Sequence, residues 1–161
     1  MDTLQIFEDG LFAAIAAIGF AAISNPPRRA YLFCAIIAAL GHSLRYILLN
    51  LPYFSVHIVI ASTVAAFVIG CFAVLLSPMA KTPAETCVFP SLLPMIPGIY
   101  AYKFFGGLVM CLFRSDESNF MHYFYLMATN GLTCLFIIFG MVVGATLPIF
   151  IFKRISFTAT R

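Results

Sequence analysis

Two cationic side chains on one apolar stretch could bind a carboxylate. His42 and Arg45 are three residues apart, a spacing that places them on one face of a helix. A guanidinium can bind a carboxylate through two parallel hydrogen bonds. The pair therefore predicts an anion-binding patch. An alternative is that Arg45, which lies near the end of its stretch, extends its head group to the outer membrane interface.

A second candidate site is a proline cluster inside another apolar run. Pro94, Pro97 and Gly98 interrupt a stretch that otherwise has the composition of a spanning helix. Each proline removes a backbone donor and clashes with the preceding turn, so a continuous helix through residues 92–99 is not expected. Broken backbone at membrane depth occurs where it lines a cavity, and it often marks a transport site. The alternative is a proline-rich loop between two ordinary spans.

The break predicts a half-helix with Pro97 in its first position. The free N–H groups at such a start attract an anion, and Met95 and Ile96 would line the gap. Lys103 follows five residues after Gly98 and could face the same cavity or extend to the interface. Asn130, in the middle of a later stretch, could bind substrate or form a hydrogen bond between helices.

Several kinds of site are missing from the sequence. No Asp or Glu lies in the middle of a predicted span, although proton-coupled transporters often use buried carboxylates. Only His42 or His57 could serve as a relay, so a proton-coupling acid is expected on another subunit. No nucleophile–base set, phosphate loop or metal-ligand pattern is present, so no enzyme activity, metal or cofactor is predicted. The five cysteines are expected to be buried hydrophobic residues.

Composition determines which elements must hold these residues. The 161 residues are 63% hydrophobic and 9% charged, whereas soluble domains have about 25% charged residues. The surrounding solvent must therefore be a lipid bilayer, and a net charge of +3 from scattered residues does not indicate nucleic-acid binding. We predict an all-α, polytopic membrane helix bundle that forms one integral membrane domain over residues 1–161. Five spans are expected, at residues 10–25, 30–50, 54–77, 86–112 and 120–151, the fourth of them broken by proline. Four spans remain if residues 30–50 lie flat on the membrane.

Charge and small residues give the expected orientation and packing. Basic residues favour cytoplasmic loops, which predicts an external N-terminus and a cytoplasmic C-terminus. The acidic start, with Asp2, Glu8 and Asp9, is not a secretory signal and fits the outside. Small residues recur every four positions at Ala13, Ala17 and Ala21 and at Gly140 and Gly144. Such stripes permit close helix contacts and predict a tightly packed bundle with faces for a partner.

The chain resembles the small, YjjB-like membrane subunit of the bacterial threonine/serine exporter family. The segments that carry this resemblance are Asn25-Pro-Pro-Arg-Arg-Ala30, Gly41-His-Ser-Leu-Arg45, Pro94-Met-Ile-Pro-Gly98 and Thr129-Asn-Gly-Leu-Thr133. The resemblance implies an inner-membrane exporter subunit that works with a second, larger membrane subunit, encoded separately or fused. It also implies efflux of threonine and serine, or of a dicarboxylate such as succinate. The alternative function is a scaffold that stabilises the partner without transporting anything itself.

Overall fold

The computed structural model describes residues 3–51, 56–113 and 116–152, and all regular elements in these ranges are helices. They are α1 (Thr3–Ser24), α2 (Arg28–Leu49), α3 (Ile58–Ala80), α4 (Ala84–Leu92), the short 3-10 helix η1 (Leu93–Met95), α5 (Gly98–Phe113) and α6 (Glu117–Ile151). The predicted all-α class is confirmed. The helices group into two compact units, which are described separately. The first holds α1 to η1 and the C-terminal part of α6 from Gly140, and the second is Ile96–Phe139.

The predicted spans correspond to helices of suitable length and composition. α1, α2, α3 and α6 are each long and apolar enough to cross a membrane, and α4 with η1 and α5 make a fifth candidate when taken together. The expected break is confirmed, because η1 ends at Met95 and α5 begins at Gly98. The connections between the predicted second and third spans and between the fourth and fifth include residues outside the described ranges.

Helix α1 begins at Thr3, not at residue 10 as predicted. Apolar residues continue on both sides of Glu8 and Asp9, so the helical pattern does not stop at the two charges. The consequence is that Asp9 lies within a candidate membrane-spanning helix.

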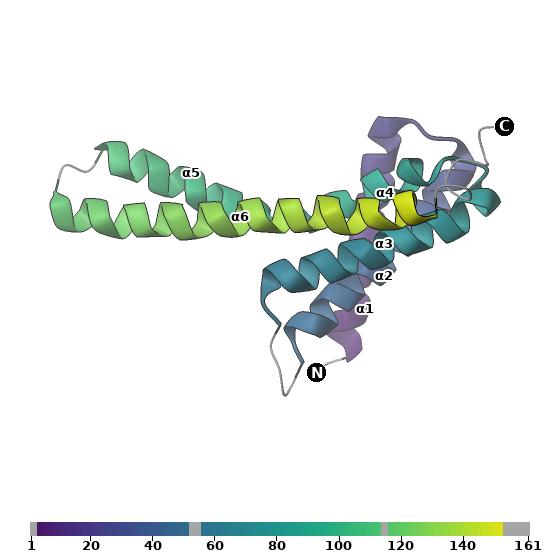
Figure 1. Ribbon diagram of the computed structural model, residues 1–161, viewed down its shortest axis with the longest axis horizontal. Coiled ribbons are helices and arrows are strands. Elements are labelled where there is room, and N and C mark those ends of the chain that lie inside the picture. The colour runs from purple at the N-terminus through teal and green to yellow at the C-terminus, as the bar shows by residue number, and fades with distance from the viewer. Residues whose placement is uncertain (1–2, 52–55, 114–115, 153–161) are drawn as a thin grey trace. The chain divides into compact units, whose positions relative to one another are not determined.

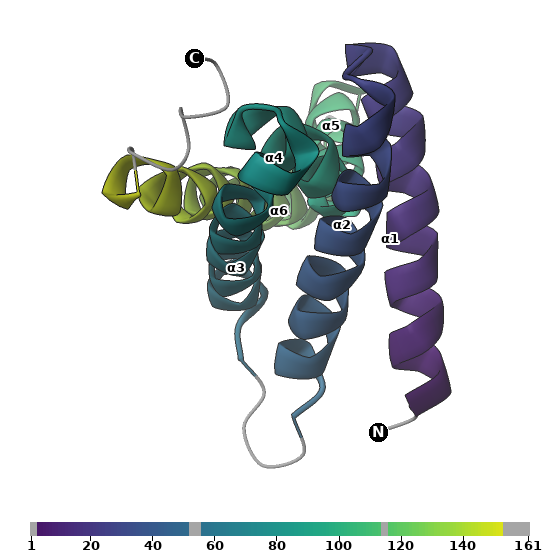
Figure 2. The ribbon, with the colours of Figure 1, turned by 90° about the vertical axis from the view of Figure 1, so that its right-hand side faces the viewer.

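Small residues allow the helices of the first unit to approach closely. α1 packs mainly along α2, and α2 also contacts α3 and α4, as Figure 2 shows. Ala13, Ala17 and Ala21 are buried on α1. A Cβ atom added to Gly10 would lie 2.5 Å from Oγ of Ser43 on α2, so the two helices are nearly in backbone contact there.

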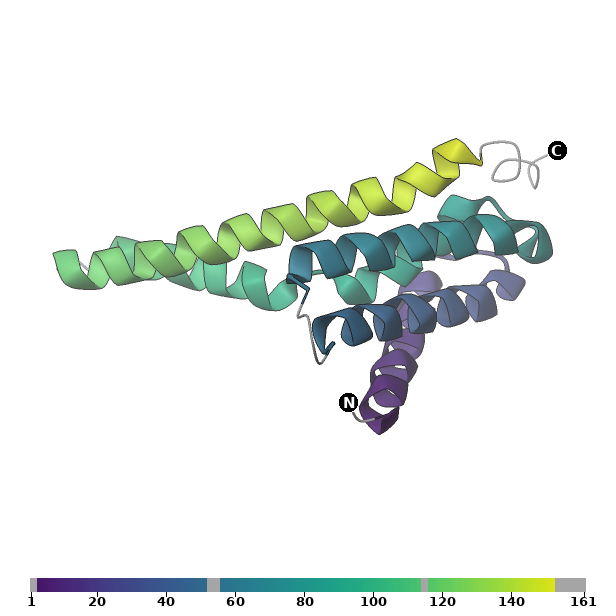
Figure 3. The ribbon, with the colours of Figure 1, turned by 60° about the horizontal axis from the view of Figure 1, so that its bottom comes forward.

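The C-terminal part of α6 lies against α3 through a second set of small residues (Figure 3). A Cβ atom at Gly144 would lie 2.5 Å from the carbonyl oxygen of Thr63, and one at Gly70 would lie 2.5 Å from that of Ala145. The predicted close helix contacts are therefore present within the chain. Because its own helices occupy these faces, we no longer expect them to bind a partner.

The outer faces of the first unit are apolar. On α1, for example, Phe7, Phe12 and Ile15 are exposed, and Leu75 on α3 is exposed as well. Large apolar side chains directed outward over several long helices are unfavourable in water but match lipid chains. The packing therefore agrees with a multi-pass membrane protein.

The second unit is a helical hairpin of α5 and the first part of α6 (Figure 1). Its close contacts again use glycine. A Cβ atom at Gly107 would lie 3.0 Å from the backbone nitrogen of Met127, and one at Gly131 would lie 2.6 Å from the ring of Phe104. The pair is thus held by backbone proximity and apolar packing.

Candidate functional site

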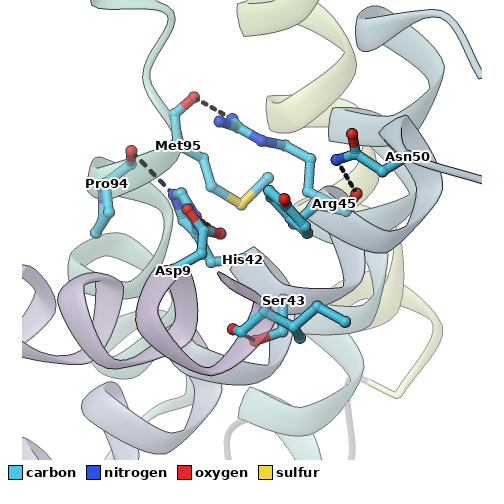
Figure 4. Close-up of polar contacts among 9 residues, drawn as sticks. Asp9, His42, Ser43, Arg45, Asn50, Pro94 and Met95 are labelled. Atoms are coloured by element: carbon cyan, nitrogen blue, oxygen red, sulfur yellow. Dashed lines mark hydrogen bonds and ion pairs between the residues drawn. The ribbon is translucent and has the colours of Figure 1, made fainter. Parts of the chain in front are cut away.

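The candidate site lies where α2 meets the end of η1, inside the first unit. Nε2 of His42 is 3.2 Å from the carbonyl oxygen of Pro94, and Nη1 of Arg45 donates to the carbonyl oxygen of Met95 at 3.0 Å. Figure 4 shows both side chains reaching from α2 to these consecutive carbonyls. The predicted pairing of His42 and Arg45 on one helix face is what allows this double contact.

The proline break explains why these carbonyls need side-chain donors. In an uninterrupted helix the N–H of Gly98 would donate to the carbonyl of Pro94. Here that N–H donates to Ile96 instead, at 2.8 Å. Backbone carbonyls away from water must find a donor, and cationic groups are favoured at the C-terminal end of a helix. His42 and Arg45 therefore cap the first half of the broken helix.

Asp9 of α1 completes the cluster. Its Oδ2 atom is 2.8 Å from Nδ1 of His42, and the two side chains are 33% and 12% exposed, respectively. The cluster thus joins α1, α2 and η1 through one imidazole ring. Asp9 was missing from the sequence-based site because the predicted first span began after it. A helical pattern extended back through Leu4 and Phe7 would have placed it inside the helix.

Further polar contacts fix α1 against α2 beside this cluster. Oγ of Ser43 donates to the carbonyl oxygen of Ile6 at 3.3 Å, and the hydroxyl of Tyr46 donates to Oε1 of Gln5 at 2.6 Å. The Met95 side chain is fully buried, whereas Ile96 is exposed. The surroundings of His42 are therefore held by several helices and do not depend on one contact.

The other predicted site residues belong to the second unit. Pro97 immediately precedes α5, and its carbonyl accepts the first helical hydrogen bond from Ala101 at 3.1 Å. It therefore flanks the helix and does not occupy the predicted first position, which Gly98 takes. Lys103 is exposed. Nδ2 of Asn130 donates to the carbonyl of Leu126 within its own helix, at 2.6 Å, and not to another helix.

His57 has a local role at the start of α3. Nδ1 of His57 accepts a hydrogen bond from the backbone of Val59 at 3.3 Å and so caps α3.

A groove of about 450 Å³ between α1 and α2 is lined by apolar side chains together with Thr3 and Ser43. Such a lining does not suit a charged substrate. Within the described ranges, no group of three or more His, Cys, Asp or Glu residues is arranged to hold a metal ion.

Comparison with known proteins gives the family. The family model described as "Threonine/Serine exporter, ThrE" matches residues 9–151. An uncharacterised protein of Haemophilus influenzae is 36% identical over 151 residues, which cover 94% of this chain and 49% of that protein. The chain thus spans about half the length of this curated relative, and no solved structure matches it. Since the family match covers most of the candidate spans and the whole Asp9–His42–Arg45 cluster, this chain belongs to the threonine/serine exporter family, ThrE.

Proposed function

We propose that the chain is a subunit of a bacterial inner-membrane exporter for small metabolites that carry a carboxylate. The substrates are threonine and serine, or a dicarboxylate such as succinate. The observation that carries this proposal is the pair of side chains, His42 and Arg45, held on the carbonyls of a broken membrane helix. Family membership supports transport, and the chemistry of the guanidinium supports a substrate that carries a carboxylate group.

In this proposal, Arg45 is the main substrate-binding residue. It donates to a neutral backbone carbonyl, that of Met95. An ionised carboxylate is a stronger acceptor for a guanidinium and can take two parallel hydrogen bonds. An arriving substrate would therefore compete with Met95 for Arg45. Binding would loosen the end of η1, which links recognition of the carboxylate to a change in the backbone at the break.

The second unit supplies secondary candidates for substrate binding. The first N–H groups of α5, after Pro97 and Gly98, have no acceptor within their own helix and favour negative charge. Lys103 adds an exposed cation on the same helix. Asn130 has a second amide hydrogen beyond the one donated to Leu126. Each of these residues can be tested separately from Arg45.

A larger membrane subunit is the proposed partner. The Haemophilus influenzae relative continues for about as many residues again beyond the region that this chain matches. That extra length supports the idea that the transporter needs a further membrane part, fused in some proteins and separate in others. The two would meet through faces other than the alanine and glycine stripes, which are covered within this chain.

Efflux measurements test this function. Labelled threonine, serine and succinate would be loaded into proteoliposomes that contain this chain alone, the larger subunit alone, or both. We expect efflux of at least one substrate only when both subunits are present. Equal efflux from the larger subunit alone and from the pair would contradict a transport role and would favour a scaffold.

The proposed orientation gives a prediction that labelling in intact cells can check. In a background without the native cysteines, Thr3→Cys should react with a membrane-impermeant thiol reagent, and Thr160→Cys should react only after the cells are opened. The reason is the bias of basic residues toward the cytoplasmic loops; Thr160 itself lies outside the described residues. Labelling of position 160 but not of position 3 in intact cells would reverse the orientation.

A further inference from the structure

The imidazole ring of His42 lies between two oxygen atoms that are both acceptors. Nδ1 faces Oδ2 of Asp9 at 2.8 Å, and Nε2 faces the carbonyl oxygen of Pro94 at 3.2 Å. A neutral imidazole has one N–H, and neither an ionised carboxylate nor a carbonyl can donate. Both contacts can form together only if the ring and the carboxyl group hold one proton more than a neutral histidine with an ionised aspartate.

The extra proton matters because the ring is largely shielded. The His42 side chain is 12% exposed, so water cannot readily replace a lost partner. Without the proton, a nitrogen lone pair would face an oxygen lone pair on one side of the ring. One contact must then open, either from α1 at Asp9 or from η1 at Pro94. An unpartnered buried polar group is unfavourable, and this favours the rearrangement.

Few other charges act on this ring. Arg45 lies one turn away on α2, and Glu8 on α1 is exposed. Helix α3 has no Asp, Glu, Lys, Arg or His between its first and last residues, and the only such residue of α4 is Glu85, in its first turn. η1 has none. Among the described residues of the first unit, Asp9 is therefore the charged group that another helix brings to His42.

We propose that Asp9 and His42 form a proton-binding site that fastens α1 and α2 to the broken helix at Pro94. Uptake of one proton closes both contacts, and release of that proton opens one of them. The consequence for transport rests on the proposed exporter function. In that function the proton is the coupling ion. It acts at the same break in the helix where Arg45 donates to the carbonyl oxygen of Met95. The acid expected on another subunit is, in this arrangement, supplied by α1 of this chain.

The substitution Asp9→Asn removes the need for the additional proton and keeps both contacts of His42. An asparagine amide can donate to Nδ1 of His42, while Nε2–H still donates to Pro94. Both contacts then persist with a neutral ring, and the additional proton is no longer needed. Glu8→Gln is the matched control, because it removes the neighbouring, exposed carboxylate and leaves the cluster unchanged.

Spectroscopy tests the proton site without any substrate. Nitrogen-15 NMR of the full chain in bilayers, with His57→Asn and His122→Gln so that one histidine remains, reports the protons on His42. Infrared spectra of the same samples report a protonated carboxyl group. With Asp9 present, we expect at neutral pH either two protonated ring nitrogens or a protonated carboxyl band, and loss of that signal at high pH. Asp9→Asn should show neither signal, and Glu8→Gln should match the parent. A neutral ring with an ionised carboxylate in the parent would overturn the proposal.

Transport measurements show whether the proton site or the proposed exporter function is wrong. In proteoliposomes with both subunits, the Asp9→Asn variant is measured with and without an imposed proton gradient, and only the ratio of its two export rates is compared with that of the parent. The variant should lose the acceleration of export by an imposed proton gradient, which Glu8→Gln should retain. An unchanged gradient response in Asp9→Asn would overturn the proton site and leave the exporter function standing. If the parent complex moves none of the substrates, the exporter function fails, while the spectra still decide whether the proton site exists.

Discussion

Replacing Arg45 by glutamine is expected to reduce export of the substrate at least tenfold at equal membrane abundance. The guanidinium lies at the end of a broken helix, where it donates to Met95 and, in our proposal, exchanges that carbonyl for a substrate carboxylate. Removing a charged hydrogen-bond partner costs roughly 1.5–3 kcal/mol, and each 1.4 kcal/mol corresponds to about tenfold in affinity. Glutamine can still donate hydrogen bonds from its amide group, but it has no charge and no planar guanidinium that could bind a carboxylate through two parallel hydrogen bonds.

Two control variants make this result specific. Arg45→Lys keeps the charge without the planar fork and should give an intermediate rate. Lys103→Gln removes an exposed cation from α5 and should have a smaller effect than Arg45→Gln. Efflux would be measured in proteoliposomes that hold the larger subunit, with the amount of each variant matched by blotting. Wild-type export by Arg45→Gln would instead mean that this side chain only caps η1 at Met95, and the carboxylate site would lie elsewhere.

Replacing Gly144 by alanine is expected to destabilise the chain, although alanine normally favours a helix. An added Cβ atom would lie 2.5 Å from the carbonyl oxygen of Thr63 and 3.2 Å from the backbone nitrogen of Phe67. Both atoms belong to the backbone of α3 and cannot turn aside, so α6 must move away from α3. Overpacking of this kind costs about 1–3 kcal/mol.

Gly19→Ala is the matched control for this effect. A Cβ atom at Gly19 would have no neighbour within 4 Å, so the substitution should be neutral or stabilise the helix by up to about 1 kcal/mol. Thermal unfolding of the purified variants, followed by circular dichroism in one detergent, compares them directly. If Gly144→Ala melts at the same temperature as Gly19→Ala, the close contact between α3 and α6 does not exist in the folded protein.

Both predictions bear on how the proposed exporter would change its conformation. Arg45 and His42 hold the end of η1 by hydrogen bonds, which a ligand or a proton can exchange. The contact of α6 with α3 depends on backbone proximity and cannot adjust in small steps. In the proposed mechanism, the movable part is therefore the broken helix and its caps, while α3 and α6 form the rigid support.

The sequence alone determined the features that depend on local chemistry. Its few charges and long apolar stretches require a lipid environment, and the hydrophobic runs place the helices. Pro94 and Pro97 break the fourth candidate span because a proline nitrogen cannot donate, whatever lies around it. The spacing of His42 and Arg45 fixes that they share a helix face. None of these conclusions needs a contact between distant parts of the chain.

The tertiary structure decided which groups those residues meet. His42 and Arg45 cap the C-terminal end of the first half-helix, at Pro94 and Met95, whereas the sequence had directed attention to the start of the second half at Gly98. These partners are about fifty residues apart in the chain, and no local pattern encodes their pairing. The same holds for Asp9, which reaches His42 only because Gly10 lets α1 approach α2 closely. Hydropathy places a helix in the membrane, but the side-chain volumes at its contacts determine its neighbours, and through them which charges become partners.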